Sequence, residues 1–193
     1  MTVWHWVRHG PTHAKSFVGW RDVPADLSDG AQINRLRQAL PGEGILVSSD
    51  LARARDTASA IASDNHHRLP HAPQLREMHF GAWDGVHFET VAERDPDLSR
   101  QFWEQPGAIE APGGESWNSA SARVAAAVRT ISARFPDQHI IAVAHFGVIL
   151  TQLQRALGIS AYDTLAHRID NFSITTIDWR GEKPSVSRIN HLP

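Results

Sequence analysis

The stretch IIAVAHFGVIL at residues 140–150 decides the fold class, because it passes from a short buried strand almost directly into a helix. Its first five residues, 140–144, are all apolar, which is typical of a strand covered on both faces. The strand ends in His145, and a helix is expected over 148–157. A strand of this kind followed by a helix indicates an α/β domain with a mostly parallel sheet.

The same alternation of short apolar runs and helical patterns recurs on either side of this stretch. The other expected strands are at 3–7, 44–49, within 68–75, 173–179 and 185–189, the last two forming an antiparallel pair. Helices are expected over 28–40, from 50 onward and over 116–135, with Ser28 and Ser116 as N-caps. This order predicts helices on both faces of one sheet.

Two segments do not fit the alternation. The glycine-bearing stretch EMHFGAWDG at 77–85 is irregular and is expected to be a loop. The segment 86–112 carries scattered aromatic residues and prolines, so we expect short helices that form a lid or insertion over the sheet. The whole chain, 1–193, is expected to be a single domain, in keeping with its length.

Composition excludes several classes of protein. A formal net charge of −2 is not that of a protein that neutralises many phosphates on nucleic acid. The chain has no cysteine, which excludes disulfides, thiolate metal sites and a cysteine nucleophile. No signal-like start and no apolar stretch of about 18 residues is visible, so a cytoplasmic protein with no membrane partner is expected.

Charged and titratable residues follow three of the predicted strands. Arg8 and His9 end the first strand, Arg53 comes one helical turn after the second, and His145 ends the strand at 140–144. Because ligands of open α/β sheets bind at the carboxyl ends of the strands, we expect these side chains to lie together. Guanidinium groups match phosphate oxygens bidentately, so the sequence predicts a phosphate site.

A phosphate site of this composition can carry out covalent chemistry without a metal ion. Two arginines at about 4 Å each stabilise an anion by roughly 4 kcal/mol at an effective dielectric constant near 20. Their positive field lowers the pKa of a neighbouring histidine, which leaves a ring nitrogen free to attack phosphorus. Glu77, in the loop at 77–85, is the candidate proton donor to the departing oxygen. The remaining histidines lack metal-ligand spacing, so no metal or cofactor is expected.

Five motifs in the same order resemble those of the histidine phosphatase superfamily, also called phosphoglycerate mutase-like. They are VRHGPT at 7–12, SSDLARARDTA at 48–58, LREMHFGAWDG at 75–85, PGGESW at 112–117 and AHFGVIL at 144–150. The resemblance implies a three-layer α/β/α sandwich with a mostly parallel central sheet. It also implies that the enzyme transfers a phosphoryl group through a phosphohistidine.

The resemblance assigns roles to individual residues. His9 matches the phosphorylated histidine and Glu77 the proton donor, while the phosphate-binding residues are matched by Arg8, Arg53, His145 and Thr12. Two positions depart from the family pattern, since Pro11 replaces the common glutamate and Lys15 stands where asparagine is frequent. A lysine in such a loop either contacts substrate or is simply solvated.

The resemblance favours a phosphatase that acts on a small-molecule phosphomonoester. The segment 86–112 is shorter than the insertion that the mutases resembling this family carry in the same place. The closing stretches look most like those of alpha-ribazole phosphatase, which makes a ribonucleoside-like 5′-phosphate one candidate substrate. A phosphoglycerate mutase and a non-catalytic phospholigand-binding protein are the alternatives.

Overall fold

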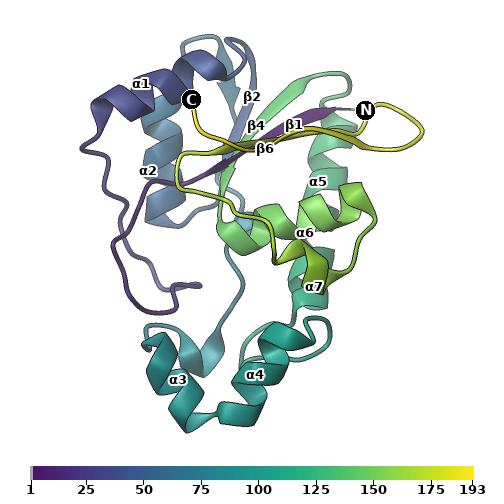
Figure 1. Ribbon diagram of the computed structural model, residues 1–193. Helices are drawn as coiled ribbons and strands as arrows, with labels where there is room; N and C mark the ends of the chain where they lie inside the picture. Colours follow the sequence, from purple (N-terminus) through teal and green to yellow (C-terminus); the bar gives the residue numbers. More distant parts are fainter. Residues whose placement is uncertain (1) are drawn as a thin grey trace.

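The computed structural model describes residues 2–193, and over these residues a six-stranded sheet forms the centre of the molecule (Figure 1). The strands are β1 (Val3–Arg8), β2 (Gly44–Ser48), β3 (His66–Arg68), β4 (His139–Ala144), β5 (Ile174–Asp178) and β6 (Ser185–His191). Their order is β3-β2-β4-β1-β5-β6. The first four in this order pair in parallel, β5 is antiparallel to β1, and β6 is antiparallel to β5. The prediction of a mostly parallel sheet is confirmed.

Helices cover both faces of this sheet, as expected (Figure 1). On one face lie α1 (Gly30–Ala39) and α2 (Ala52–Ile61); on the other lie α5 (Trp117–Arg134), α6 (Phe146–Leu157) and the short α7 (Ala161–Thr164). Alternate residues of β4 face opposite layers: Ile140 packs toward α5 and α6, and Ile141 toward α1 and α2. Burial on both faces explains why the run at 140–144 is continuously apolar.

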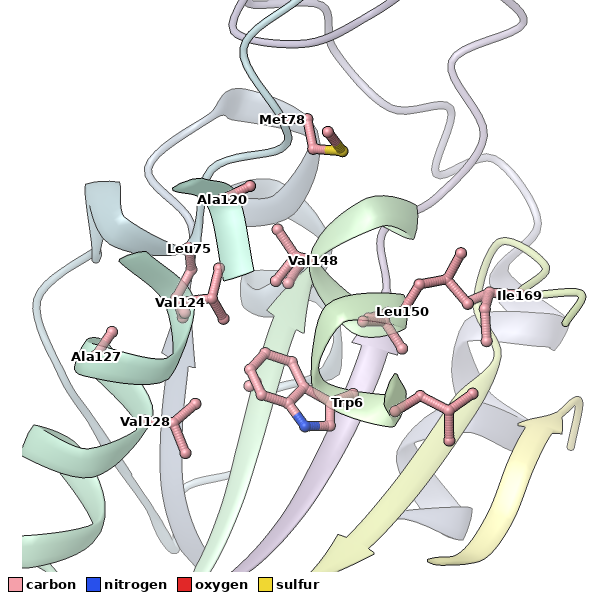
Figure 2. Close-up of a cluster of buried hydrophobic side chains, with 14 of the residues drawn as sticks. Trp6, Leu75, Met78, Ala120, Val124, Ala127, Val128, Val148, Leu150 and Ile169 are labelled. Atoms are coloured by element: carbon pink, nitrogen blue, oxygen red, sulfur yellow. The ribbon is translucent and has the colours of Figure 1, made fainter. Parts of the chain in front are cut away.

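The larger core lies between the sheet and the layer of α5 and α6. Figure 2 shows the indole of Trp6 on β1 beneath Leu150 of α6, with Val124 and Val128 of α5 lining the same space. Met78 belongs to the same cluster and lies beyond the ends of the strands (Figure 2). The core therefore extends from the sheet into the loop that carries Glu77.

The segment 86–112 forms two short helices, α3 (Phe88–Arg94) and α4 (Pro96–Glu104), which lie together at one end of the molecule (Figure 1). Aromatic side chains pack this end: Phe102 of α4 makes edge-to-face contacts with Trp83 and Trp103. The expected short helices are present, and a lid function for them stays a prediction.

Some local expectations were wrong. The N-cap of α1 is Asp29, whose carboxylate accepts from Gln32 N at 2.9 Å, and Ser28 lies before it. The third strand is confined to His66–Arg68, and Pro73–Leu75 forms the 3₁₀ helix η1 instead of continuing the strand. Pro70 and Pro73 lack the N–H that a ladder requires, which explains the early end. Ser116, by contrast, caps α5 as predicted.

The loop at 77–85 is irregular as expected, and it contains a single 3₁₀ turn, η2 (Gly81–Trp83). Across the part of the chain that the structure describes, no helix has the length and apolar character needed to cross a bilayer.

Candidate active site

The two predicted site histidines lie side by side because β1 and β4 are adjacent parallel strands. Arg8 is paired with Ala144 in the ladder, so the next residues, His9 and His145, leave the sheet together. The N–H of His9 donates to the Ala144 carbonyl at 3.1 Å. The two imidazole rings are 5.0 Å apart between centroids, with planes inclined by 60°.

Both predicted arginines are held in place by backbone carbonyls. Arg53, which is almost fully buried on α2, donates to the carbonyl oxygens of Gly19 at 2.6 Å and Arg21 at 3.0 Å. Arg8 donates to the Ile169 carbonyl at 2.6 Å. Burial lowers the pKa of both guanidinium groups and the Glu77 carboxylate raises it; arginine keeps its charge in proteins.

One hydrogen bond sets the tautomer of His9. Its Nδ1 lies 2.6 Å from the carbonyl oxygen of Gly10, which can only accept, so Nδ1 carries the proton and Nε2 keeps a free lone pair. Burial lowers the pKa of His9 to about 3, aided by the charges of Arg53 and Arg8 and opposed by the Gly10 hydrogen bond. The imidazole is therefore neutral at physiological pH.

Glu77 is held by two backbone N–H groups. Its Oε1 accepts from Met78 N at 2.9 Å, and its Oε2 accepts from Gly147 N, in the first turn of α6, at 3.2 Å. A Cβ atom at position 147 would lie 2.6 Å from Oε1, so glycine is what allows the carboxylate this close to the helix. The side chain is buried and comes from the loop that follows η1.

The peptide oxygen of Glu77 is held as firmly as its carboxylate. The indole Nε1 of Trp20 donates to it at 2.8 Å, and Arg123 of α5 donates to it at 3.3 Å. Arg123 is itself paired with Glu115 at 2.8 Å. These residues were not predicted to take part in the site, and no periodic pattern in the sequence points to them.

His145 is fully buried beside His9, and neither of its ring nitrogens has a hydrogen-bond partner among residues 2–193. Burial, reinforced by the positive charge of Arg53, lowers its pKa well below the usual range. A neutral imidazole presents one donor and one acceptor, so His145 can donate one hydrogen bond to an anion next to His9.

A cavity of about 280 Å³ brings most of the predicted residues together. It is lined by Arg8, His9, Thr12, Arg53 and Glu77, together with Ala14, Ser16, Phe17, Val18, Phe80, Phe88, Trp103 and Phe146. His145 is not among the described lining residues, and neither are Pro11 and the exposed Lys15. A larger cavity of about 420 Å³, between the C-terminal parts of α5 and α6, contains none of the predicted residues.

Two polar residues that the sequence interpretation missed tie the site together. Thr57 Oγ1 donates to the Arg53 carbonyl at 2.7 Å and accepts from Gly10 N at 3.0 Å, which links α2 to the loop after β1. Asn171 donates to the His9 carbonyl at 2.8 Å. Thr57 stands one helical turn after Arg53 in the motif at 48–58, and this spacing is a usable signal. In the described chain no group of three or more acidic or histidine side chains is arranged to hold a metal ion.

The sequence of this chain matches the family model of the histidine phosphatase superfamily (branch 1) over residues 5–192. The chain belongs to the histidine phosphatase superfamily. The superfamily resemblance drawn from the five motifs is thus confirmed, while the roles of the individual residues remain predictions.

Several known proteins are similar to this chain in sequence or in fold. The bifunctional protein Rv2228c of Mycobacterium tuberculosis is 32% identical over 89% of this chain, which spans 45% of that protein. A metal-independent phosphoserine phosphatase of Arabidopsis thaliana is 31% identical over 75% of this chain and 61% of its own length. The adenosylcobalamin/alpha-ribazole phosphatase of Escherichia coli K12 is 28% identical over 89% and 87%. Among solved structures, Bacillus stearothermophilus YhfR shares the fold, with a TM-score of 0.91 over 100% and 98% of the chains at 23% identity.

Proposed function

We propose that this chain is a metal-independent phosphomonoesterase that works through a phosphohistidine on His9. The observation that carries the proposal is the His9–Gly10 hydrogen bond, which leaves Nε2 unprotonated in a cavity shared with two arginines and a carboxyl group. Such a group is a nucleophile matched to an anionic electrophile. The relatives named as phosphatases support the same reaction class.

In the first half-reaction, Nε2 of His9 attacks phosphorus and the bond from phosphorus to the leaving oxygen breaks. Arg8 and Arg53 offset the negative charge of the transferred group, as a metal ion does in other phosphoryl-transfer enzymes. The protonated carboxyl of Glu77 gives its proton to the leaving oxygen, so the product departs as a neutral alcohol. His145 donates a hydrogen bond to a phosphoryl oxygen.

In the second half-reaction, water replaces the alcohol. The Glu77 carboxylate, held by the N–H groups of Met78 and Gly147, takes a proton from the water as its oxygen attacks phosphorus. The bond between Nε2 and phosphorus breaks, inorganic phosphate leaves, and His9 and Glu77 return to their starting states. The bonds and protons that change in both half-reactions belong to the substrate, His9, Glu77 and water alone.

The substrate in this proposal is a small phosphorylated metabolite. The cavity of about 280 Å³ is of a size that holds a small molecule. The relatives named for alpha-ribazole and phosphoserine hydrolysis make alpha-ribazole 5′-phosphate and phosphoserine the first compounds to assay.

The test is a panel of phosphomonoesters assayed with the wild-type chain, His9→Ala and His191→Ala, the last an exposed histidine on the edge strand β6. We expect His9→Ala to abolish turnover and acid-labile phosphoenzyme, while His191→Ala and added chelator change neither. Chelator-sensitive hydrolysis that survives in His9→Ala would contradict the proposal. Isomerisation of phosphoglycerate faster than its hydrolysis would indicate a mutase instead, and absence of any phosphoenzyme would indicate a binding protein.

A further inference from the structure

The cavity is lined by two chemically different groups of residues. One contains the phosphate-directed side chains Arg8, His9, Arg53 and Glu77. The other, here called the aromatic wall, consists of Phe17, Phe80, Phe88, Trp103 and Phe146. Of these five, only Phe146 lies next to the end of a strand, at the start of α6 after β4. The others come from the long loop after β1 (Phe17), the loop at 77–85 (Phe80), α3 (Phe88) and α4 (Trp103).

Two members of the aromatic wall are unusually exposed for their size. Phe88 is 51% exposed and Trp103 is 39% exposed, although both are large apolar side chains. Both rest on the buried ring of Phe17: Phe88 edge-to-face at 4.6 Å, and Trp103 nearly parallel, with 15° between the planes, at 6.2 Å between centroids. Exposed apolar surface that is fixed in position and borders a cavity is typical of a ligand-binding surface.

The cavity has no further cation for a second anionic group, since its remaining polar side chains are the neutral hydroxyls of Thr12 and Ser16. A phosphate monoester carries a charge of about −1.5 to −2, which Arg8 and Arg53 offset. Among the described lining residues these are the only permanently cationic side chains, and Glu77 is the only acidic one. A substrate carboxylate would lose hydration without gaining a cation, and it would face the negative faces of aromatic rings. The nearby Lys15 is exposed and outside the lining.

We infer that this site selects phosphomonoesters whose leaving group is apolar, flat and uncharged, and that Phe88 and Trp103 determine this selectivity. The inference rests on the proposed phosphatase function and specifies its substrate class. Phosphorylated amino acids and phosphoglycerates are then poor substrates, because their carboxylate has no partner in the aromatic wall.

The first experiment compares three substrates of similar chemistry at the reacting phosphorus. Ethyl phosphate, 2-phenylethyl phosphate and phosphoserine are all esters of primary alcohols, so differences in kcat/KM report mainly on contacts with the leaving group. We expect 2-phenylethyl phosphate to exceed ethyl phosphate by roughly tenfold or more, because a buried apolar group of even one methylene changes selectivity by about 10–200-fold. We expect phosphoserine to fall below ethyl phosphate.

The second experiment assigns the selectivity to the wall. In Phe88→Ala and Trp103→Ala we expect the ratio of kcat/KM between 2-phenylethyl and ethyl phosphate to fall by several-fold or more. The matched control is Tyr162→Ala, which removes a 59% exposed aromatic from α7, outside the cavity, and leaves the ratio unchanged. Phe88→Arg supplies the missing cation and should raise kcat/KM for phosphoserine relative to the wild type, a gain that misfolding cannot produce.

The outcomes separate the two proposals. Hydrolysis of phosphoserine in preference to 2-phenylethyl phosphate, with phosphohistidine formed on His9, would overturn the selectivity and leave the phosphatase function standing. Ratios that do not change in Phe88→Ala and Trp103→Ala would overturn the assignment to the wall. Absence of hydrolysis and of phosphohistidine with all three esters would overturn both proposals.

Discussion

At the scale of single residues, the site depends on hydrogen bonds to main-chain atoms. The Gly10 carbonyl fixes the tautomer of His9, and two peptide N–H groups fix the carboxylate of Glu77. Gly147 belongs to α6, Thr57 holds the N–H of Gly10, and Trp20 and Arg123 hold the peptide between Glu77 and Met78. These groups therefore do not have to be ordered when a substrate arrives. The nucleophile and the proton donor are therefore preorganised by the fold itself.

Gly147 provides a test of this preorganisation. In Gly147→Ala the new methyl group would lie 2.6 Å from Glu77 Oε1, so the carboxylate must move. We expect kcat to fall by about 10²-fold or more, the usual worth of a general acid. The free energy of unfolding should fall by about 1–3 kcal/mol, since the methyl group also meets Met78 Cγ and Sδ at 3.2 Å in a buried, well-packed place. Steady-state kinetics and denaturant unfolding measure the two quantities.

The control for this substitution is Gly30→Ala, at the first residue of α1, where a Cβ atom meets nothing within 4 Å. It should leave kcat unchanged. An unaltered kcat in Gly147→Ala would contradict the role given to the carboxylate position.

The sequence anticipated the polar half of the site better than the apolar half. Arg8 ends β1 and His9 follows it, while Arg53 lies in the first turn of α2, the helix that follows β2. Parallel strands end at one edge of a sheet, so the convergence of these residues is predictable. Phe88 and Trp103 reach the cavity only through the packing of α3 and α4 on Phe17. No periodicity in 86–112 encodes that contact, because it depends on tertiary structure.

At the scale of elements, α5 positions the loop that carries Glu77. Its Arg123 donates to the carbonyl oxygens of Gln74 at 2.7 Å and Arg76 at 3.0 Å, and it is paired with Glu115. One guanidinium group thus connects a helix, the end of η1 and the segment before α5. We interpret Arg123 as a positioning residue for Glu77.

Removal of this guanidinium group should affect catalysis more than substrate binding. In Arg123→Met we expect kcat to fall by tenfold or more with little change in KM. The free energy of unfolding should drop by about 1–3 kcal/mol, because Glu115 loses its ion-pair partner and keeps only the N–H of His79. Arg123→Lys should restore part of the stability and little of kcat, because lysine cannot reproduce the fork of donors. Arg129→Met, an exposed position on the same helix, is the control. Equal loss of kcat in both methionine variants would argue against positioning.

Elements with a long hydrophobic pattern were predicted better than elements with a short one. The sequence identifies β2 and β4 by their continuous apolar runs and α5 by its helical spacing of apolar residues. These patterns are unambiguous because many residues follow each of them. β3 and α7, with three and four residues, are too short to show a period. β3 forms because it pairs with β2, which the local sequence does not record. α7 has a local cap in Ser160, whose hydroxyl accepts from Asp163 N at 3.0 Å, and the sequence interpretation missed this signal.

At the scale of the whole molecule, folding buries several histidines in their neutral form. Burial lowers the pKa of His5 to about 4, with help from His139 and Arg188, and burial lowers the pKa of His9 to about 3. Burial also holds the pKa of His145 well below the usual range. In the unfolded chain each group titrates near 6.5. Between about pH 4 and 6.5 the unfolded chain therefore binds protons that the folded protein does not.

This difference predicts that the protein loses stability on mild acidification. Folded-state pKa values below the unfolded values mean that the stabilisation is complete above about pH 6.5 and is lost as pH falls, by about 1.4 kcal/mol per pH unit for each histidine. Denaturant unfolding at pH 7, 6, 5.5 and 5 measures the slope, and His9→Gln should reduce it by one histidine's share. Buried carboxylates cannot mimic the effect in this range, because ordinary aspartate titrates near 3.9 in the unfolded chain. A free energy of unfolding that stays constant from pH 7 to 5 would show that these histidines are not held neutral, and the unprotonated Nε2 on which the proposed chemistry depends would lose its support.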